Sequence, residues 1–208
     1  MIKIQEGREM RIILASKSPR RKEIFGAFAR ECGFRFDIIT RQTDEELFGE
    51  HPRTGVKTLA ERKGAAVAAE YPDALVVSSD TLVELGGVPL GKPIDENDAC
   101  RMLRELSGKT HNVHTGIALT LGGRVYSGVA TTEVTFRELG DEEIRAYVAT
   151  GEPMDKAGAY GIQGKGGSLV ASYNGEFDTV VGFNMTLLRR LIGEAIGDTR
   201  LLGGEKND

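Results

Sequence analysis

The chain has 208 residues, of which 40% are apolar and 28% charged, so it can bury the core of a globular domain. Its formal net charge of −4 excludes a global basic field for nucleic acid or an anionic membrane surface. No apolar segment reaches the length of a membrane span, and residues 1–10 lack the apolar core of a signal peptide. A cytoplasmic enzyme or binding protein fits these properties, with Cys32 and Cys100 expected to be reduced thiols.

The first predicted elements are a buried strand over residues 11–15 and a helix that begins after Ser18. Ser18 is a favourable N-cap, and Pro19 is suited to the first helical position. Arg20 and Arg21 then oppose the helix dipole, which disfavours cations there by about 0.3–1 kcal/mol each. Cations beside free backbone N–H groups favour a phosphate site, although solvated arginines on a capped surface helix fit equally well.

Strand and helix patterns alternate along the rest of the chain, which predicts α/β architecture. Further strands are expected at residues 34–39, 74–79 and 168–172, and as a hairpin within 110–136 around two glycines. Further helices are expected at residues 54–71, from the cap Asp95 to Gly108, at 141–150 and at 185–196. The glycine-rich segment 152–167 is expected to be irregular. A single domain over 1–208, with flexible ends at 1–9 and 198–208, is the predicted organisation.

Asp80 and Thr81 follow the apolar run at 74–79 and are predicted to stand at the carboxyl end of a central strand. Ligands of open α/β sheets bind at such ends. A carboxylate there could hold Mg²⁺ or activate a water molecule. The alternative is an ordinary turn, where Asp and Thr are both common.

Three further charged residues are candidates for the same site. Lys63 lies at helical spacing from Leu59 and Val67, so its ammonium needs a counter-charge unless it reaches the surface. Lys92, between a glycine and a proline, is either a fixed cation or a turn lysine. Glu45 in the acidic loop 44–46 is a second candidate carboxylate, with a solvated side chain as its alternative.

Gln163 lies in the glycine-rich segment and offers both a donor and an acceptor to the edge of a base. His111 and His114 are three residues apart on a predicted strand, so they face opposite sides and cannot hold one metal together there. Neither has a neighbouring Ser or Cys nucleophile, which argues against a hydrolytic triad.

Six blocks of the chain resemble, in the same order, the motifs of the Maf family of nucleoside triphosphate pyrophosphatases. They are LASKSPRR at residues 14–21, LAERK at 59–63, SDT at 79–81, GKP at 91–93, LSGKTH at 106–111 and DKAGAYGIQG at 155–164. The resemblance runs from about residue 11 to residue 191. It implies a Maf/ITPase-like α/β fold, in which a central mixed twisted sheet is flanked by helices and two lobes surround a deep cleft.

The resemblance also implies an activity. The family hydrolyses a nucleoside triphosphate between its α- and β-phosphates, giving the monophosphate and pyrophosphate, with a divalent metal such as Mg²⁺, Mn²⁺ or Co²⁺. The form of residues 161–164 (GIQG) is similar to the branch that prefers dTTP and UTP. House-cleaning of nucleotide pools in the cytoplasm goes with this activity. Its expected partner is a small-molecule nucleoside triphosphate, without nucleic acid or membrane, and a homodimer is one assembly that fits.

Individual roles carry over by position. The resemblance implies triphosphate contacts for Ser16, Arg20 and Arg21, and further cations of the site at Lys63 and Lys92. It implies metal-binding carboxylates at Glu45 and Asp80, with Asp80 as proton acceptor, and a role in substrate choice for Arg20, Thr81 and Gln163.

Ser79 departs from the alanine that is usual in the family, and residues 182–185 (GFNM) depart from the usual Gly-Leu-Pro ending. Two other functions stay open. One is a purine pyrophosphatase acting on inosine or xanthosine triphosphate, which a substrate panel would reveal. The other is a nucleotide-binding regulator of cell division or septum formation with little turnover, although binding alone would not need both carboxylates.

Overall fold

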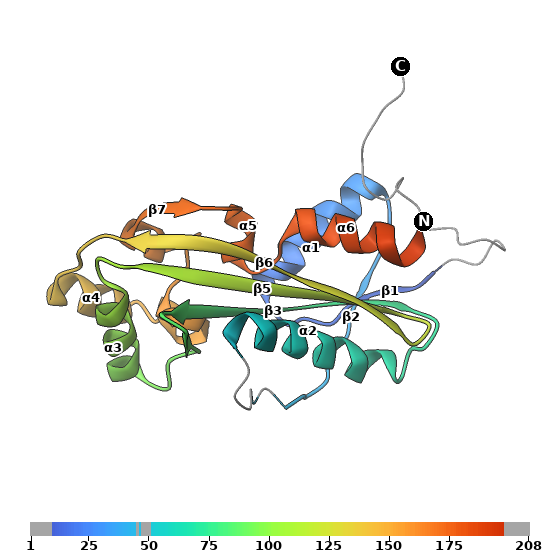
Figure 1. The fold of residues 1–208 in the computed structure, drawn as a ribbon, viewed down its shortest axis with the longest axis horizontal. Helices are drawn as coiled ribbons and strands as arrows, with labels where there is room; N and C mark the ends of the chain where they lie inside the picture. Colours follow the sequence, from blue (N-terminus) through green and yellow to red (C-terminus); the bar gives the residue numbers. More distant parts are fainter. Residues whose placement is uncertain (1–9, 45, 47–50, 198–208) are drawn as a thin grey trace, which may run out of the picture.

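The computed structural model describes residues 10–44, 46 and 51–197, which form one mixed sheet with helices on both faces (Figure 1). The strand order is β2-β1-β3-β5-β6-β7, and β4 pairs with β3. β1 pairs in parallel with both β2 and β3, and the other pairs are antiparallel. The strands are β1 (Ile12–Leu14), β2 (Asp37–Ile38), β3 (Leu75–Leu85), β4 (Val88–Leu90), β5 (Thr110–Leu121), β6 (Arg124–Phe136) and β7 (Val170–Asn174). The predicted mixed α/β sheet is therefore confirmed.

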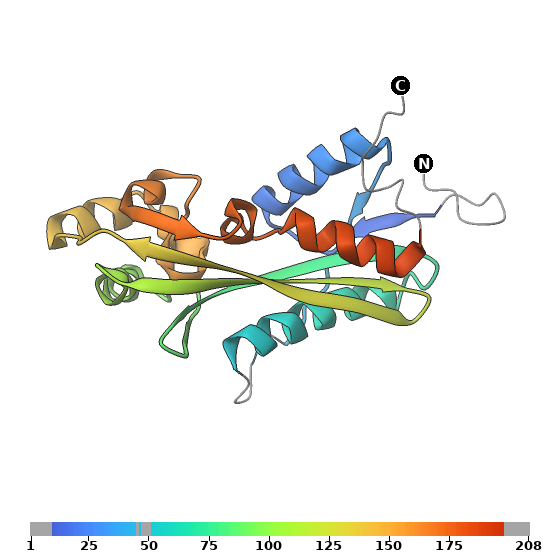
Figure 2. The same cartoon turned by 45° about the horizontal axis from the view of Figure 1, so that its top comes forward.

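The helices divide between the two faces of the sheet. In Figures 1 and 2, α2 covers one face of β3 and β5, whereas α1 and α6 lie on the opposite face. None of the described helices is long and apolar enough to cross a membrane. The helices are α1 (Pro19–Cys32), α2 (Pro52–Ala68), α3 (Glu96–Leu106), α4 (Asp141–Val148), α5 (Phe177–Val181) and α6 (Met185–Ile196), with 3₁₀ turns at Glu152–Asp155, Ala157–Ala159 and Lys165–Leu169.

Local signals set several of these boundaries. The Ser18 side chain accepts a hydrogen bond from the backbone of Arg21, and Pro19 occupies the first helical position, as predicted. Asp95 caps α3 in the same way. The turn between β5 and β6 uses Gly122 and Gly123, both at positive φ, as a tight hairpin requires.

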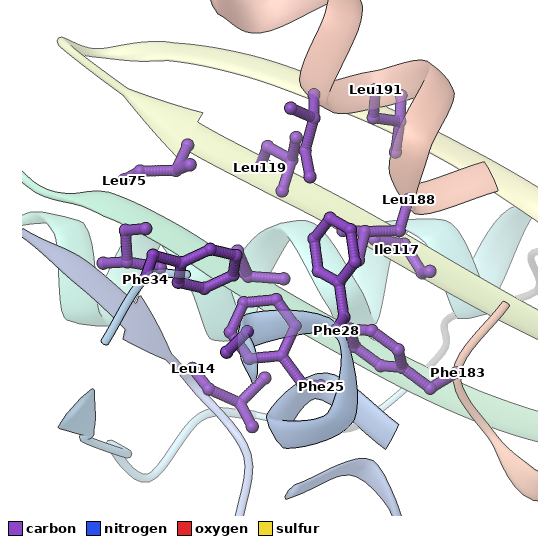
Figure 3. Packing of buried hydrophobic residues seen from close by; sticks show 14 of the residues in the cluster. Leu14, Phe25, Phe28, Phe34, Leu75, Ile117, Leu119, Phe183, Leu188 and Leu191 are labelled. Carbon is purple, nitrogen blue, oxygen red and sulfur yellow. The ribbon is translucent and has the colours of Figure 1, made fainter. Parts of the chain in front are cut away.

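The core fills both sides of the buried strands. Ile12 and Leu14 of β1 pack under α1 and α6, whereas Ile13 points to the opposite face. Figure 3 shows Phe25 of α1 within the cluster that these residues of β1 form with α1 and α6. Its ring centroid lies 4.9–6.2 Å from those of four other phenylalanines. Burial and edge-to-face packing of these rings fix α1, and with it the loop at its N-terminus, against the sheet.

The prediction that Asp80 ends a strand is wrong. β3 continues to Leu85, because its antiparallel pairing with β5 extends from Val76 to Glu84. The strand that ends nearby is β1, which pairs only with residues 75–77 of β3, while β4 pairs with residues 83–85. Between them, residues 78–82 have no partner on this edge among the described strands. Asp80 therefore still lies beyond the carboxyl end of a parallel strand, but that strand is its neighbour.

Other differences are smaller. The strand expected at 34–39 contains only Asp37–Ile38, since just two residue pairs join it to β1. The short elements β4 and α5 were not predicted. Both cysteines are free, as predicted. The ends 1–9 and 198–208, predicted to be flexible, lie outside the described residues.

Candidate active site

A cavity of about 910 Å³ opens along the unpaired edge of β3. Its walls come from the loop between β1 and α1 with the first turn of α1, residues 40–43, the Lys63 side of α2 and residues 155–163. β1 runs alongside residues 75–77 of β3 and does not extend as far as Asp80. Residues on both faces of β3 therefore border this space. The cavity thus gathers segments that are far apart in the sequence.

The lining is strongly cationic. Among its described residues, seven lysines and arginines stand against two carboxylates, Asp80 and Asp155, although the chain as a whole carries a net charge of −4. Positive charge concentrated in a concave site attracts a polyanion such as a triphosphate. The seven cations are Lys17, Arg20, Arg21, Arg41, Lys63, Lys92 and Lys156.

Lys63 and Asp80 form a partly buried ion pair in the cavity wall. The Nζ of Lys63 lies 2.6 Å from Oδ1 of Asp80, and the two side chains are 19% and 13% exposed. The predicted need of Lys63 for a counter-charge is therefore met by Asp80. Within the described part of the chain, Lys63 is the sole hydrogen-bond partner of this carboxylate. Its other oxygen keeps the capacity to accept a hydrogen bond or to bind a cation.

Arg20 and Asp155 join two segments of the cavity lining, the first turn of α1 and the 3₁₀ turn Glu152–Asp155. Nη1 of Arg20, in the first turn of α1, lies 3.8 Å from Oδ2 of Asp155, and Lys156 donates to Oδ1 of the same carboxylate at 2.7 Å. Partial burial alone would raise the pKa of Asp155, but the Lys156 and Arg20 cations hold it below its ordinary value. Asp155 is therefore ionised at neutral pH and partly neutralises the cationic lining.

Arg21 lines the cavity but is held by acceptors of the protein itself. Its Nε donates to the Gly182 carbonyl at 2.8 Å, Nη1 to the Ser79 carbonyl at 2.7 Å and Nη2 to Oγ1 of Thr81 at 2.9 Å. The Ser79 carbonyl belongs to the open edge of β3. Arg21 therefore joins the start of α1 to this edge and to the turn after α5.

The glycine-rich segment is organised around Glu152. Its carboxylate accepts hydrogen bonds from the Tyr147 hydroxyl at 3.0 Å and from the backbone N–H groups of Lys165 and Gly166 at 3.0 and 3.1 Å. Burial acts to raise the pKa of Glu152, but these donors hold it below its ordinary value. A Cβ on Gly164 would collide with this carboxylate, so glycine is required there. The resulting loop carries Gln163 to the cavity.

The structure brings nearly all of the predicted site residues together. Those that line the cavity are Ser16, Arg20, Arg21, Lys63, Asp80, Thr81, Lys92 and Gln163. Glu45 lies outside the described residues. Several lining residues were not predicted, namely Lys17, Arg41, Asp155, Lys156 and Tyr160. The two motif blocks that contain Ser16 and Gln163 also contain four of these residues, Lys17, Asp155, Lys156 and Tyr160. Their position in those blocks could have identified them as site residues.

The oxygen donors of the cavity suit a hard cation. The described residues contain no group of three or more His, Cys, Asp or Glu that could enclose a metal. Mg²⁺, however, is usually held by one or two carboxylates together with substrate phosphates. Asp80 and the Ser16 hydroxyl, which both line the cavity, offer donors of this type. The residues present therefore fit Mg²⁺ that is shared with a phosphate ligand.

Fold and cavity together define an α/β protein with a cation-lined site at an open sheet edge. The chain belongs to the Maf-like protein family, whose sequence profile matches residues 11–195.

Three relatives named dTTP/UTP pyrophosphatase show how far the similarity extends. That of Bacillus velezensis is 45% identical over 185 residues, covering 88% of this chain and 96% of the relative. The Thermococcus onnurineus protein is 47% identical over 180 residues, covering 86% and 95%. The Aquifex aeolicus protein is 43% identical over 185 residues, covering 89% and 95%. A solved HAM1 protein from Coxiella burnetii, at 16% identity and a TM-score of 0.49 over 90% of this chain and 100% of that one, is too weak a likeness to bear on function.

Proposed function

We propose that this protein is a nucleoside triphosphate pyrophosphatase that hydrolyses dTTP and UTP to the monophosphate and pyrophosphate. The observation that carries the proposal is the Lys63–Asp80 pair at the wall of a cavity lined by seven cations. Membership of the Maf-like family and relatives named dTTP/UTP pyrophosphatase support the same activity and the same substrates.

The cations supply the binding and much of the catalysis. A triphosphate carries about four negative charges, and in this proposal Arg20, Lys63 and Lys92 offset them together with the Ser16 hydroxyl. Stabilisation of the charge that develops on the departing pyrophosphate is the main catalytic contribution expected of such fixed cations. Lys92 is exposed and therefore suits the outer end of the triphosphate.

Asp80 is the proposed proton acceptor. Lys63 fixes one of its oxygens, so the other is oriented to take a proton from a water molecule in the cavity. That water attacks the α-phosphorus, the bond between the α-phosphorus and the bridging oxygen breaks, and pyrophosphate leaves. Lys63 keeps the carboxylate in place while the proton is transferred.

A divalent cation completes the proposed site. Mg²⁺, with Mn²⁺ or Co²⁺ as alternatives, would be held by Asp80 and, following the family resemblance, by Glu45. Its contribution when bound would be to neutralise phosphate charge and to polarise the phosphoryl oxygens.

Substrate choice is assigned to Arg20, Thr81 and Gln163, all of which line the cavity. The Gln163 amide has a donor and an acceptor for the edge of a base, and its N–H can donate to a carbonyl oxygen of thymine or uracil. A cytoplasmic location, a homodimer and a role in cleaning nucleotide pools stay predictions that accompany this function.

Pyrophosphate release from every natural nucleoside triphosphate, from several modified ones and from inosine and xanthosine triphosphate tests the proposal. We expect kcat/KM for dTTP and UTP to exceed that for the purine nucleotides by about ten-fold or more. Chelation of the metal should abolish turnover, and re-addition of Mg²⁺ or Mn²⁺ should restore it. Preference for the inosine and xanthosine nucleotides would support the purine pyrophosphatase. Absence of pyrophosphate release with every triphosphate and both metals would support the nucleotide-binding regulator.

A further inference from the structure

Three threonine residues connect the cavity wall to the interior of the protein. Thr81 of β3 lines the cavity, and its register partner on β5 is Thr115, which is fully buried and not part of the lining. The two hydroxyl oxygens lie 3.1 Å apart. Thr115 also contacts the backbone carbonyl of Thr179 in α5, at 2.7 Å.

The direction of each hydrogen bond in this chain follows from the number of protons. A carbonyl oxygen only accepts, so the single hydroxyl proton of Thr115 goes to Thr179. Thr115 therefore accepts in its contact with Thr81, and Thr81 is the donor. Arg21 in turn donates from Nη2 to Oγ1 of Thr81 at 2.9 Å. The proton of Thr81 is thus donated to Thr115, and one of its lone pairs accepts from Arg21. The Thr81 hydroxyl can therefore form one more hydrogen bond, and only as an acceptor.

The surroundings hold this arrangement in place. The Thr179 carbonyl also accepts the backbone N–H of Gly182 at 3.1 Å, so both of its lone pairs are used. The Gly182 carbonyl accepts from Nε of Arg21 at 2.8 Å and from the Ser79 hydroxyl at 3.0 Å. Gly182 has φ of +110°, and a Cβ there would lie 2.9 Å from Oγ1 of Thr81. Rotation of the Thr81 hydroxyl toward another acceptor would leave Thr115 without its donor.

We propose that Arg21 and Thr115 are positioning residues that fix the Thr81 hydroxyl as a hydrogen-bond acceptor, and that this oxygen accepts the N3–H of thymine or uracil. The inference rests on the proposed function and specifies how its site recognises the base. Thymine and uracil present a donor at N3, whereas cytosine presents an acceptor there. An oxygen that can only accept is left facing a lone pair when cytosine binds, and such a mismatch is costly in a partly buried site.

This assignment also changes the role of Arg21 from the predicted triphosphate contact. Three of the guanidinium N–H groups are directed at Gly182, Ser79 and Thr81, which lie on two separate segments, β3 and the turn after α5. Such a planar fork positions its acceptors in a way that a lysine cannot reproduce. The charge of Arg21 contributes to the cavity, but its geometry serves Thr81.

Two matched variants of Thr115 provide the test. Thr115→Val keeps the shape of the side chain and removes the acceptor for the Thr81 proton, so Thr81 can turn its proton to the cavity. Thr115→Ser keeps the hydroxyl. We expect the ratio of kcat/KM for dTTP to that for dCTP to fall about ten-fold in Thr115→Val and to stay near its wild-type value in Thr115→Ser. Partial unfolding lowers the amount of active enzyme for both substrates equally and leaves this ratio unchanged. A wild-type ratio in Thr115→Val would overturn the proposal.

Arg21→Lys gives an independent measurement because it keeps the positive charge. We expect it to lower the same ratio about ten-fold, through KM for dTTP more than through kcat. Ser79→Ala is the control, since it removes the second donor to the Gly182 carbonyl without touching Thr81. Its ratio should match the wild type. An equal rise in KM for both nucleotides in Arg21→Lys, with the ratio intact, would make Arg21 a phosphate contact and contradict the inference.

Binding measurements separate this inference from the proposed function. If the wild type releases no pyrophosphate from any triphosphate, the proposed function fails. Titration calorimetry with the α,β-methylene analogues of dTTP and dCTP, in the presence of Mg²⁺, then measures base recognition directly. Tighter binding of the thymidine analogue, reduced in Thr115→Val and retained in Thr115→Ser, supports the inference. Equal affinity for the two analogues in the wild type contradicts it.

Discussion

Asp80 and Glu84 lie four residues apart on the same face of β3, yet they are in opposite chemical situations. Asp80 lines the cavity, and one of its oxygens is bound by Lys63. Glu84 is only 7% exposed, and both of its oxygens are occupied, Oε2 by Nε2 of His114 at 2.8 Å and Oε1 by the backbone N–H of Gly87 at 2.8 Å. A buried carboxylate with both oxygens bound stabilises the fold, whereas one with an unbound oxygen at a cavity can take part in a reaction.

The strand neighbours of β3 produce this difference. Opposite Glu84, β4 turns back and pairs Pro89 with it, which closes the sheet edge and brings the turn glycines close. Opposite Asp80, neither β1 nor β4 reaches the edge. Burial acts to raise the pKa of Glu84, but His114 and the Gly87 N–H hold it below its ordinary value. Glu84 is therefore ionised and bound within a closed polar cluster.

The largest effect is expected from Asp80→Asn. The amide keeps the size of the side chain but cannot take a proton from water, so kcat should fall by about 10²–10⁴-fold. The protein should still fold, because the amide oxygen can accept the hydrogen bond from Lys63. Loss of the counter-charge should lower the free energy of unfolding by only about 1 kcal/mol, since both residues line the open cavity. Pyrophosphate release and urea unfolding measure the two quantities. Near-normal turnover in this variant would remove Asp80 from the proposed chemistry.

Glu84→Gln should behave in the reverse way. Loss of the charged acceptor next to His114 should lower the free energy of unfolding by about 1.5–3 kcal/mol. Turnover per folded molecule should stay at the wild-type value, since Glu84 does not line the cavity. If Glu84→Gln instead abolished turnover while stability was retained, the distinction between the two carboxylates would be lost.

Buried His111 makes the stability of the folded protein depend on pH. It lies 2% exposed on β5, where its Nε2 contacts the Tyr160 hydroxyl at 2.9 Å, and burial lowers its pKa from 6.5 to about 4. The unfolded chain binds this proton more readily than the folded one, so its contribution to stability is complete above pH 6.5 and is lost as the pH falls toward 4. Between about pH 7 and pH 5 the loss amounts to about 2 kcal/mol.

Urea unfolding of the wild type and of His111→Gln at both pH values measures this contribution. The variant has no imidazole at this position, so its stability should fall less between the two pH values, whatever its absolute stability. Identical pH dependences in the two proteins would show that His111 is not responsible.

The structure agrees with the sequence-based predictions where local rules decide it. The Ser18-Pro19 pair fixes the start of α1, and the helix at 185–196 has the predicted bounds. Lys63 was correctly expected to need a counter-charge because helical spacing places it on a buried face. The motif blocks also contain most of the residues that line the cavity.

Contacts between distant segments could not be predicted in this way. The extension of β3 past Asp80 depends on its register with β5, and Arg21 reaches a carbonyl 161 residues away at Gly182. The pairing of Glu84 with His114 spans 30 residues. α5 has only five residues and is held by contacts such as that between Asp178 and the backbone of Met185. Propensity over a local window contains no information on any of these.

Asp155 is a third kind of carboxylate, and the smallest effect is expected there. Its side chain is 65% exposed and neutralises Arg20 and Lys156 within the cationic lining. Asp155→Asn should strengthen the attraction for a triphosphate and lower KM by up to about five-fold, since exposed ion pairs contribute only about 0.2–1 kcal/mol. Asp155→Glu, which keeps the charge, is the control. The effect should shrink in about 0.5 M salt, because screening weakens exposed charges. A rise in KM in Asp155→Asn would show instead that Asp155 positions the cations for the substrate, as Lys63 is proposed to position Asp80.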